Sequence, residues 1–206
     1  MSASSDFYRL THKKYLYNIT HIDNIPSIIQ NGIMSFDDIK HMSHHSIAMN
    51  DVQLRRDSVL IPGGDRLHSY ANLYFTFHNP MLYKRQNIAE DLCILCILAF
   101  SCDVLDIKDC VVSDRNAAAN LAKFYSAEEG IRNLDFDKIF AQFWIHDDPY
   151  EQSNHKAIKC AEILVPHCIP YDYVVAACFV SQNAEQRLRN AGFDREVSIN
   201  AKVFYR

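Results

Sequence analysis

The sequence predicts an α+β protein whose mixed or antiparallel β-sheet is flanked by helices. Short runs of β-branched and aromatic residues alternate irregularly with short helical patterns along the chain. There is no βαβ rhythm and no GxGxxG fingerprint, which argues against a Rossmann fold or a TIM barrel. Because no repeat, linker or low-complexity segment divides the chain, we expect residues 1–206 to form a single domain of ordinary globular composition, 49% hydrophobic and 22% charged.

The clearest local signal is a strand followed by a helix near the start of the chain. Residues 15–21 are β-branched and aromatic, which is typical of a strand. Either Asp23 or Asn24 can cap the helix that follows, and Pro26 suits its first turn, where no amide donor is lost. Gly32 marks the end of this helix.

The other elements are predicted from the same signals of alternation, capping and turn residues. A polar, His-rich segment with weak helical signals covers residues 35–56, and a Pro-Gly-Gly turn follows at residues 61–65. Strands are expected over residues 71–77, 92–100, 104–107, 161–165, 173–180 and 197–205. Helices or helical turns are expected over residues 116–123, 135–140 and 183–190.

Charge, hydropathy and cysteine usage narrow the functional classes. The net charge of −4 argues against a protein held on nucleic acid mainly by a basic surface, whereas an enzyme with a local groove stays open. Residues 1–8 are polar and lead into no signal peptide, and the longest apolar stretch, residues 92–100, is too short to cross a bilayer as a helix. Seven irregularly spaced cysteines favour free thiols in a reducing cytoplasm.

For two groups of potential metal ligands, the sequence favours a structural or solvent-exposed role over metal binding. Cys93 and Cys96 form a CxxC, but in a strand their side chains face opposite sides and no turn shapes a zinc knuckle, so buried apolar cysteines are favoured. His41, His44 and His45 lie in a polar segment, and we expect them to face solvent. No metal site is therefore predicted.

One carboxylate is a candidate for catalysis. Glu162 begins an apolar run, AEILVP, and a carboxylate that enters a buried strand is costly unless it is paired or functional. The polar segment 147–156 precedes it and is expected to be a flexible loop that leads into the strand. The alternative is a glutamate on an edge strand that faces water. Other catalytic motifs, GxxxxGK[ST], HExxH and GxSxG, are absent, and no cysteine lies in an electropositive turn suited to a Cys–His nucleophile.

Four segments, taken in order, resemble the DarT family of DNA ADP-ribosyltransferase toxins. They read YNITHIDNIPSIIQNGI near the start, LRRD at residues 54–57, LYFTFHNPMLY at residues 73–83 and KCAEILVPHCIP at residues 159–170. The first and third are long and specific, and the resemblance spans residue 15 to about residue 190.

The resemblance implies an ADP-ribosyltransferase fold, a split β-sheet with an NAD cleft between its halves. It implies that ADP-ribose passes from NAD+, a co-substrate used without a metal, to a base in single-stranded DNA, with release of nicotinamide. Thymine is the usual acceptor, and guanine is the acceptor in a second branch. The resemblance also implies a toxin–antitoxin system whose DarG-like partner has a macrodomain that removes the modification.

The chemistry of the residues agrees with this implication. Breaking the nicotinamide–ribose bond builds positive charge on the sugar, as in glycoside hydrolysis. A carboxylate near the ribose stabilises that charge and takes the proton from the attacking base nitrogen, and we assign both roles to Glu162. An arginine can hold the NAD pyrophosphate bidentately. We favour Arg56 over its neighbour Arg55, and the alternative for the arginine is a solvent-exposed side chain.

Polar and aromatic side chains on two predicted strands are expected to line the NAD cleft. On the first strand, Asn18, Thr20 and His21 offer hydrogen-bonding groups. On the second, Tyr74 or Phe77 stacks on nicotinamide or packs the cleft wall. The alternative is structural: a buried, satisfied histidine at the strand end and aromatic residues that fill the core.

The segment 148–159 precedes the glutamate, where related enzymes choose their acceptor. His155, Lys156 and Lys159 are candidates for contacts with phosphates or bases, and Tyr150 is a candidate for stacking on an extruded base. A mobile polar loop without such contacts is the alternative.

Two departures from the family pattern bear on the target base rather than on the reaction. Asn18 stands where the first strand of the family usually has a histidine, and residues 71–75 read ANLYF where the family reads nearer to VPFYF. Transfer to RNA or protein and a non-catalytic nucleic-acid-binding module on the same fold both stay open. The turn at residues 79–83 argues against an RNA 2′-phosphotransferase.

Overall fold

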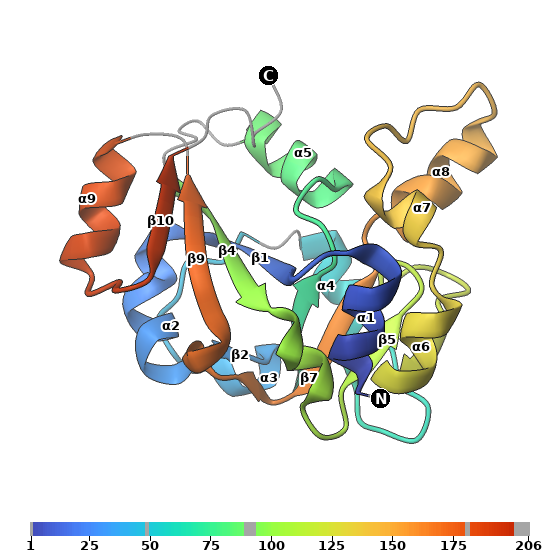
Figure 1. Ribbon diagram of the computed structural model, residues 1–206, viewed down its shortest axis with the longest axis horizontal. Helices are drawn as coiled ribbons and strands as arrows, with labels where there is room; N and C mark the ends of the chain where they lie inside the picture. The colour runs from blue at the N-terminus through green and yellow to red at the C-terminus, as the bar shows by residue number, and fades with distance from the viewer. Residues whose placement is uncertain (1, 48–49, 89–93, 180–181, 200–206) are drawn as a thin grey trace.

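The structure, a computed structural model, describes residues 2–47, 50–88, 94–179 and 182–199, in which helices surround a large β-sheet (Figure 1). The described strands are β1 (Tyr15–His21), β2 (Ile33–Met34), β3 (Tyr70–Tyr74), β4 (Leu95–Ser101), β5 (Val111–Ser113), β6 (Phe124–Ser126), β7 (Glu162–Pro166), β8 (Cys168–Ile169), β9 (Val174–Phe179) and β10 (Glu196–Ile199). The described α-helices are α1 (Ala3–Thr11), α2 (Ile25–Asn31), α3 (Phe36–Ile39), α4 (Asn50–Asp57), α5 (Pro80–Ile88), α6 (Ala127–Asn133), α7 (Phe136–Phe140), α8 (Pro149–Ile158) and α9 (Gln182–Asn190).

Among the described strands, eight form one sheet in the order β10-β9-β4-β1-β3-β7-β5-β6, and β2 pairs with β8. Neighbours are antiparallel except β9 and β10, which run parallel. The predicted α+β class with a mixed sheet is confirmed. The strand at residues 15–21 is confirmed as well, and so are the helices around residues 135–140 and 183–190.

The large sheet is split between β1 and β3. β1 pairs with β4 from Tyr15 to His21, but it meets β3 only where Tyr17 lies opposite Tyr74. On the other side, β3 pairs with β7 along its whole length, and this register places Tyr74 opposite Glu162. One strand, β3, therefore separates the split between the two halves from the glutamate strand β7.

The N-terminal helix α1, which the sequence did not reveal, closes one end of the core. Phe7 is fully buried, and its ring centroid lies 5.7 Å from those of Phe75 and Phe136. The buried Asp6 carboxylate accepts hydrogen bonds from Arg132 of α6 and from Arg9, and these guanidinium groups, Arg132 foremost, lower the pKa of Asp6. Aromatic packing and this ion pair together hold α1 against the sheet and α6.

Strand β3 stops at Tyr74 rather than at residue 77, and residues 79–83, predicted as a turn, begin helix α5. Asn79 is fully buried, and its Oδ1 accepts a hydrogen bond from the amide of Leu82 at 3.0 Å. This caps the helix, and Pro80 fits its first turn.

The segment predicted as a flexible loop at residues 147–156 is helix α8. Asp148 caps this helix by accepting a hydrogen bond from the amide of Tyr150 at 2.9 Å, and Pro149 is its first residue. His155 and Ile158 are buried. The polar composition therefore belongs to the exposed face of a helix and not to a loop.

The predicted helix at residues 116–123 is absent, because backbone amides there form turn bonds or donate to side chains. The amides of Ala119 and Ala122 donate to carbonyls three residues earlier, and that of Lys123 donates to the Asp114 carboxylate. These bonds take the place of the i to i−4 ladder of an α-helix.

The predicted strand at residues 104–107 is also wrong, because Cys102–Asp106 form a 3-10 helix capped by Ser101. Residues 92–93, 180 and 200–205 of three other predicted strands lie outside the described residues, as does Cys93. In the described parts of the chain, no helix has both the length and the apolar composition needed to cross a bilayer.

Candidate active site

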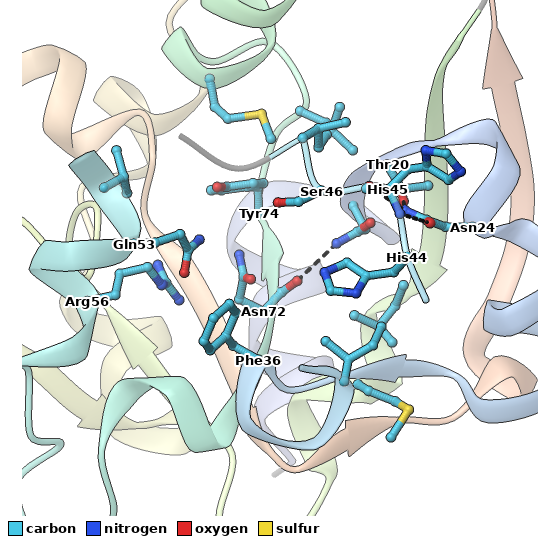
Figure 2. Close-up of a pocket in the computed structure, with 18 of the residues that line it drawn as sticks. Thr20, Asn24, Phe36, His44, His45, Ser46, Gln53, Arg56, Asn72 and Tyr74 are labelled. Carbon is cyan, nitrogen blue, oxygen red and sulfur yellow. Dashed lines mark hydrogen bonds between the residues drawn. The ribbon is translucent and has the colours of Figure 1, made fainter. Parts of the chain in front are cut away.

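A cavity of about 390 Å³ opens where the two halves of the sheet separate. Side chains from β1, β3, α3 and α4 and from residues 44–47 line it (Figure 2). Its volume lies in the range of small-molecule and cofactor sites. Polar groups face it from opposite walls, with Gln53 and Arg56 on one side and Asn24, His44 and His45 on the other.

Glu162 lies directly behind the wall of this cavity and is fully buried. Its Oε1 and Oε2 accept hydrogen bonds from Arg56 Nη1 at 3.1 and 2.9 Å, and Oε1 also accepts one from the amide of Ala117 at 2.8 Å. The Glu162 amide donates to Ser113 Oγ. Because β7 lies between β3 and β5, the alternative of an edge-strand glutamate facing water is wrong.

The two neighbouring arginines of α4 differ in their surroundings. Arg56 is 7% exposed, lines the cavity and forms the buried ion pair with Glu162. The side chain of Arg55 is 59% exposed and lies 3.7 Å from Asp51, although it too contributes to the cavity wall. The sequence preference for Arg56 therefore has a geometric basis, since it alone of the pair contacts the carboxylate.

Asn18 and Tyr74 line the cavity where β1 and β3 meet. The amide nitrogen of Asn18 donates to the Asn72 carbonyl at 3.3 Å and so bridges the split (Figure 2). Tyr74 is buried, and burial, reinforced by the charge of Glu162, raises its pKa. Phe77 lies outside the cavity wall and packs on Tyr17, with ring centroids 4.9 Å apart.

His21 supports the cavity from its edge, while Thr20 lines it. The His21 ring stacks on His45 with centroids 4.6 Å apart, and its Nδ1 accepts a hydrogen bond from the Asp23 amide. Burial lowers the pKa of His21, partly opposed by Asp23. Asn24 holds the backbone of His45 through two hydrogen bonds of 2.8 and 2.9 Å. His44 and His45, predicted to face solvent, are half-buried and exposed respectively, and both also line the cavity.

His21, Asp23 and His45 form a group of potential metal ligands. The two imidazole planes differ by only 18°, and imidazole lone pairs lie in the ring plane. Nearly parallel stacked rings therefore do not direct their lone pairs to a common ion. Asp23 is in addition paired with Arg187 at 2.6 Å.

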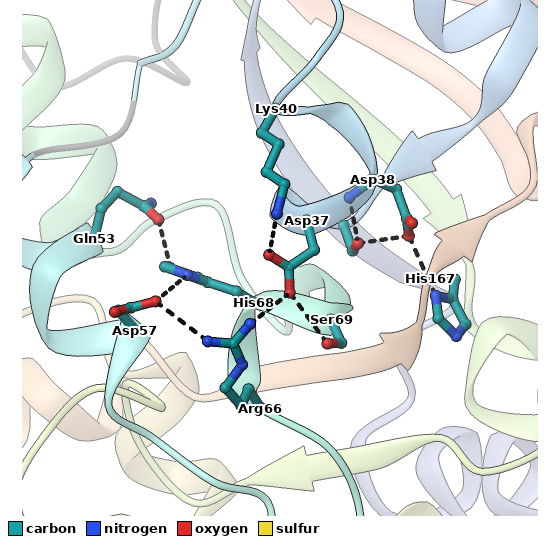
Figure 3. Close-up of polar contacts among 10 residues, drawn as sticks. Asp37, Asp38, Lys40, Gln53, Asp57, Arg66, His68, Ser69 and His167 are labelled. Atoms are coloured by element: carbon teal, nitrogen blue, oxygen red, sulfur yellow. Dashed lines mark hydrogen bonds and ion pairs between the residues drawn. The ribbon is translucent and has the colours of Figure 1, made fainter.

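A polar network fixes α4 beside the cavity (Figure 3). His68 Nε2 lies 3.1 Å from Gln53 Oε1 and its Nδ1 lies 3.4 Å from Asp57, both on α4. Arg66 lies 3.9 Å from Asp57 and from Asp37 of α3. When His68 donates from Nε2, the amide nitrogen of Gln53 stays available as a donor at the cavity wall.

A second depression of about 810 Å³ adjoins the first and shares Pro80 and Lys84 with it. We call it the aromatic groove. Its lining residues come from α5 and the turn before it, from α8 and from the segment between α7 and α8: His78, Pro80, Tyr83, Lys84, Gln142, Phe143, Trp144, Ile145, Gln152 and Lys156. Phe143 and Ile145 are 70% and 77% exposed, which is unusual for large apolar side chains.

The structure separates the four residues predicted to contact nucleic acid. Lys156 is exposed in the aromatic groove, and Tyr150 is 75% exposed on α8. His155 is buried between His146 and the Lys138 carbonyl, so it presents no free ring nitrogen. Lys159 is 1% exposed and donates to two backbone carbonyls, so the prediction that it contacts phosphates or bases is corrected.

Sequence reasoning did not identify several cavity-lining residues. Gln53 is one helical turn away from Arg56, and Asn72 lies two residues before Tyr74 in the same strand. Because Arg56 and Tyr74 were predicted site residues, their closeness to Gln53 and Asn72 could have revealed both. Phe36 and Asn116 come from distant segments, and only the tertiary fold brings them to the cavity.

Comparison with known proteins adds a family match that covers most of the chain. A family model described as ssDNA thymidine ADP-ribosyltransferase, DarT, matches residues 17–205. The DNA ADP-ribosyl transferase-DNA ADP-ribosyl glycohydrolase fusion protein of Thermosipho africanus is 32% identical over 188 residues, which are 89% of this chain and 47% of that protein. This chain therefore spans about half the length of that relative. A DNA ADP-ribosyl transferase of Thermus aquaticus is 29% identical over 167 residues, 77% of this chain and 72% of the relative.

Solved structures agree with the sequence match. Thermosipho africanus DarTG in complex with ADP-ribose superposes with a TM-score of 0.83 at 29% identity, over 94% of this chain and 51% of that one. Thermus sp. 2.9 DarT in complex with ADP-ribosylated ssDNA gives a TM-score of 0.80 at 25% identity, over 94% of this chain and 97% of that one. The expected split-sheet fold is thereby confirmed.

Proposed function

The chain belongs to the DarT family of ssDNA thymidine ADP-ribosyltransferases, and from this premise we propose that it transfers ADP-ribose from NAD+ to a base in single-stranded DNA. The observation that carries the proposal is the buried pair of Glu162 and Arg56 at the wall of a cavity large enough for a cofactor. The ADP-ribosylated ssDNA held by the Thermus relative supports the same reaction. Thymine is the acceptor that the family description favours over guanine.

In the proposed reaction, the bond between nicotinamide and the ribose breaks and its electron pair leaves with nicotinamide. Glu162 stabilises the positive charge that develops on the sugar. The base nitrogen forms the new bond to the ribose carbon that nicotinamide has left, and the proton of this nitrogen passes to the Glu162 carboxylate. Arg56, which contacts this carboxylate and lines the cavity, holds the NAD pyrophosphate.

The other proposed contacts with NAD+ are made by residues that line the cavity wall. Asn18, Thr20 and Arg55 supply hydrogen-bonding groups, and Tyr74 supplies an aromatic wall for nicotinamide. His21 acts indirectly, because it stacks on His45 at the cavity edge.

The acceptor strand is proposed to lie in the aromatic groove, which opens next to the NAD cavity. Exposed aromatic rings offer stacking platforms for unpaired bases, and Lys84 and Lys156 offer cations for phosphates. Tyr150, exposed on the same helix as Lys156, extends this surface. Phe77 shapes the region between groove and cavity through its contact with Tyr17.

Partner and compartment are proposed on separate grounds. The Thermosipho relative joins a DNA ADP-ribosyl transferase to a DNA ADP-ribosyl glycohydrolase in one chain. This fusion supports the proposal that the present chain is a toxin and that its partner is a DarG-like antitoxin with a macrodomain. The described cysteines, among them Cys96, Cys110 and Cys160, are free thiols, which supports the proposal that the protein is located in the cytoplasm. Residues 1–206 are proposed to act as one catalytic domain without a metal.

Mass spectrometry tests the reaction directly. The protein is incubated with NAD+ and mixed single-stranded DNA oligonucleotides, alongside RNA and protein acceptors. We expect one ADP-ribose on a DNA base, and a loss of about 10²–10⁴-fold in Glu162→Gln. NAD+ hydrolysis without any DNA adduct, or an adduct confined to RNA or protein, would overturn the DNA assignment.

A further inference from the structure

Lys159 is a buried cation for which the proposed reaction has no use. Its side chain is 1% exposed, at the C-terminal end of α8 and three residues before Glu162. Burying an ammonium costs several kcal/mol unless hydrogen bonds compensate for the lost water, so a lysine here calls for an explanation.

The Lys159 ammonium is bonded to the segment that forms one wall of the aromatic groove. Nζ donates to the carbonyls of Ile139 and Ala141 at 3.0 and 2.5 Å, where helix α7 ends. It also lies 5.6 Å from the centre of the Trp144 ring. Carbonyls at a helix C-terminus attract a cation, and an aromatic face does the same.

Trp144 in turn reaches the opposite wall of the groove. Its ring contacts Tyr83 of α5 edge-to-face, with centroids 6.2 Å apart. One ammonium therefore connects the chain segment leading into Glu162 with the end of α7 and with an aromatic side chain that lines the groove.

We propose that Lys159 is a positioning residue that fixes the aromatic wall of the acceptor groove relative to Glu162. The inference rests on the proposed function in assigning the groove to the acceptor strand. The contacts of Nζ with residues 139–144 stand independently of that assignment. A misplacement of a positioning element by about 1 Å can cost up to 10²-fold in rate, so an internal anchor for this wall has a functional value.

The protonation of Lys159 gives the proposal a direct readout. Burial lowers the pKa of Lys159 to about 8, opposed by the neighbouring Cys160. Titratable side chains on the two helices that Lys159 joins include Lys156 and His155 of α8, the latter hydrogen-bonded to His146, and Lys138 of α7, paired with Asp135. Trp144 is the only tryptophan in the sequence, so the tryptophan fluorescence of the protein reports on the surroundings of this one side chain.

The experiment compares the wild type with Lys159→Met, which keeps an unbranched apolar side chain but lacks the ammonium, and with Lys108→Met, an exposed control outside the cavity and the groove. For Lys159→Met we expect the KM for an oligonucleotide acceptor to rise about tenfold, while nicotinamide release in the absence of DNA changes by less than about twofold. Lys108→Met should match the wild type. An unchanged acceptor KM, or equal losses in both assays, would overturn the positioning role.

Fluorescence tests the anchor even if Lys159→Met does not fold or if DNA is not the acceptor. In the wild type, the Trp144 emission maximum should shift with a midpoint near pH 8, and Lys108→Met should titrate identically. In a folded Lys159→Met the shift should be absent. A wild-type emission that stays flat from pH 7 to pH 11 would overturn the proposal, whereas a titrating anchor in an enzyme that modifies no DNA would refute only the function of the groove.

Discussion

At the scale of single residues, the site depends on a carboxylate that has no contact with solvent. Glu162 receives hydrogen bonds from a guanidinium and from a backbone amide, so the buried carboxylate is paired. In the proposed reaction, a carboxylate behind the cavity wall stabilises the developing sugar cation. The same burial makes the residue dependent on its partner, because an unpaired buried charge is strongly destabilising.

Arg56→Gln should therefore destabilise the protein by about 3–5 kcal/mol, since it leaves Glu162 buried without its cation. The neighbouring substitution Arg55→Gln removes the same charge from an exposed side chain and should change the free energy of unfolding by no more than about 0.5 kcal/mol. Urea denaturation measures both values. Equal effects for the two variants would contradict the distinction drawn between them.

At the scale of elements, the sequence was most informative near the start of the chain, where a strand and a helix carry their own start and stop signals. The strand at residues 15–21 and helix α2, with Pro26 in its first turn and Gly32 at its end, were predicted because their signals are local. Gly32 adopts φ 74°, and a Cβ there would lie 2.3 Å from the Ile169 carbonyl oxygen. Both observations explain why glycine occupies this position.

Elements whose hydrogen bonds are decided by tertiary contacts could not be predicted in this way. Residues 116–123 have helical composition, but the Ala117 amide is used by Glu162, which is distant in sequence. Glu162 and Arg56 were found because a charge at the head of an apolar run and an arginine in a family segment are visible in the sequence. Asn116 was missed because only the packing of that irregular segment brings it to the cavity.

Because α6 packs closely on β5, the effect of an added methyl group in α6 on the stability of the protein can be predicted. Gly130 lies inside α6, and a Cβ there would approach Val112 Cγ2 to 2.0 Å. Replacing a helical glycine with alanine gains about 0.5–1 kcal/mol of helix propensity, whereas overpacking a core costs about 1–3 kcal/mol. Because Val112 is fully buried on the strand next to β7, we expect Gly130→Ala to be destabilising.

Chemical denaturation of Gly130→Ala should show a net loss of about 1–2 kcal/mol. Glu128→Ala, an exposed position of the same helix, should stay within about 0.5 kcal/mol of the wild type. A Gly130→Ala variant as stable as the wild type would show that α6 can move away from β5 without cost.

At the scale of the whole molecule, a net charge of −4 has to be reconciled with the proposed single-stranded DNA substrate. The described surface places Lys84 and Lys156 in the aromatic groove beside exposed rings, and in the proposed function these local cations and stacking platforms take the place of a basic surface. Few phosphate contacts imply a weak dependence on salt, because each neutralised phosphate of a single strand contributes only about −0.7 to the slope of log K against log salt.

Two phosphate contacts predict a slope of about −1.4, so affinity for a single-stranded oligonucleotide should fall about sevenfold between 50 and 200 mM salt. Replacing both Lys84 and Lys156 with Gln should remove most of that slope. Replacing Lys108 and Lys123 with Gln changes the net charge by the same amount, from −4 to −6, but at exposed positions outside the groove, and should leave the slope unchanged. Fluorescence anisotropy titrations at several salt concentrations distinguish the two outcomes. If both double variants weaken binding equally, overall charge and not the groove governs association with DNA.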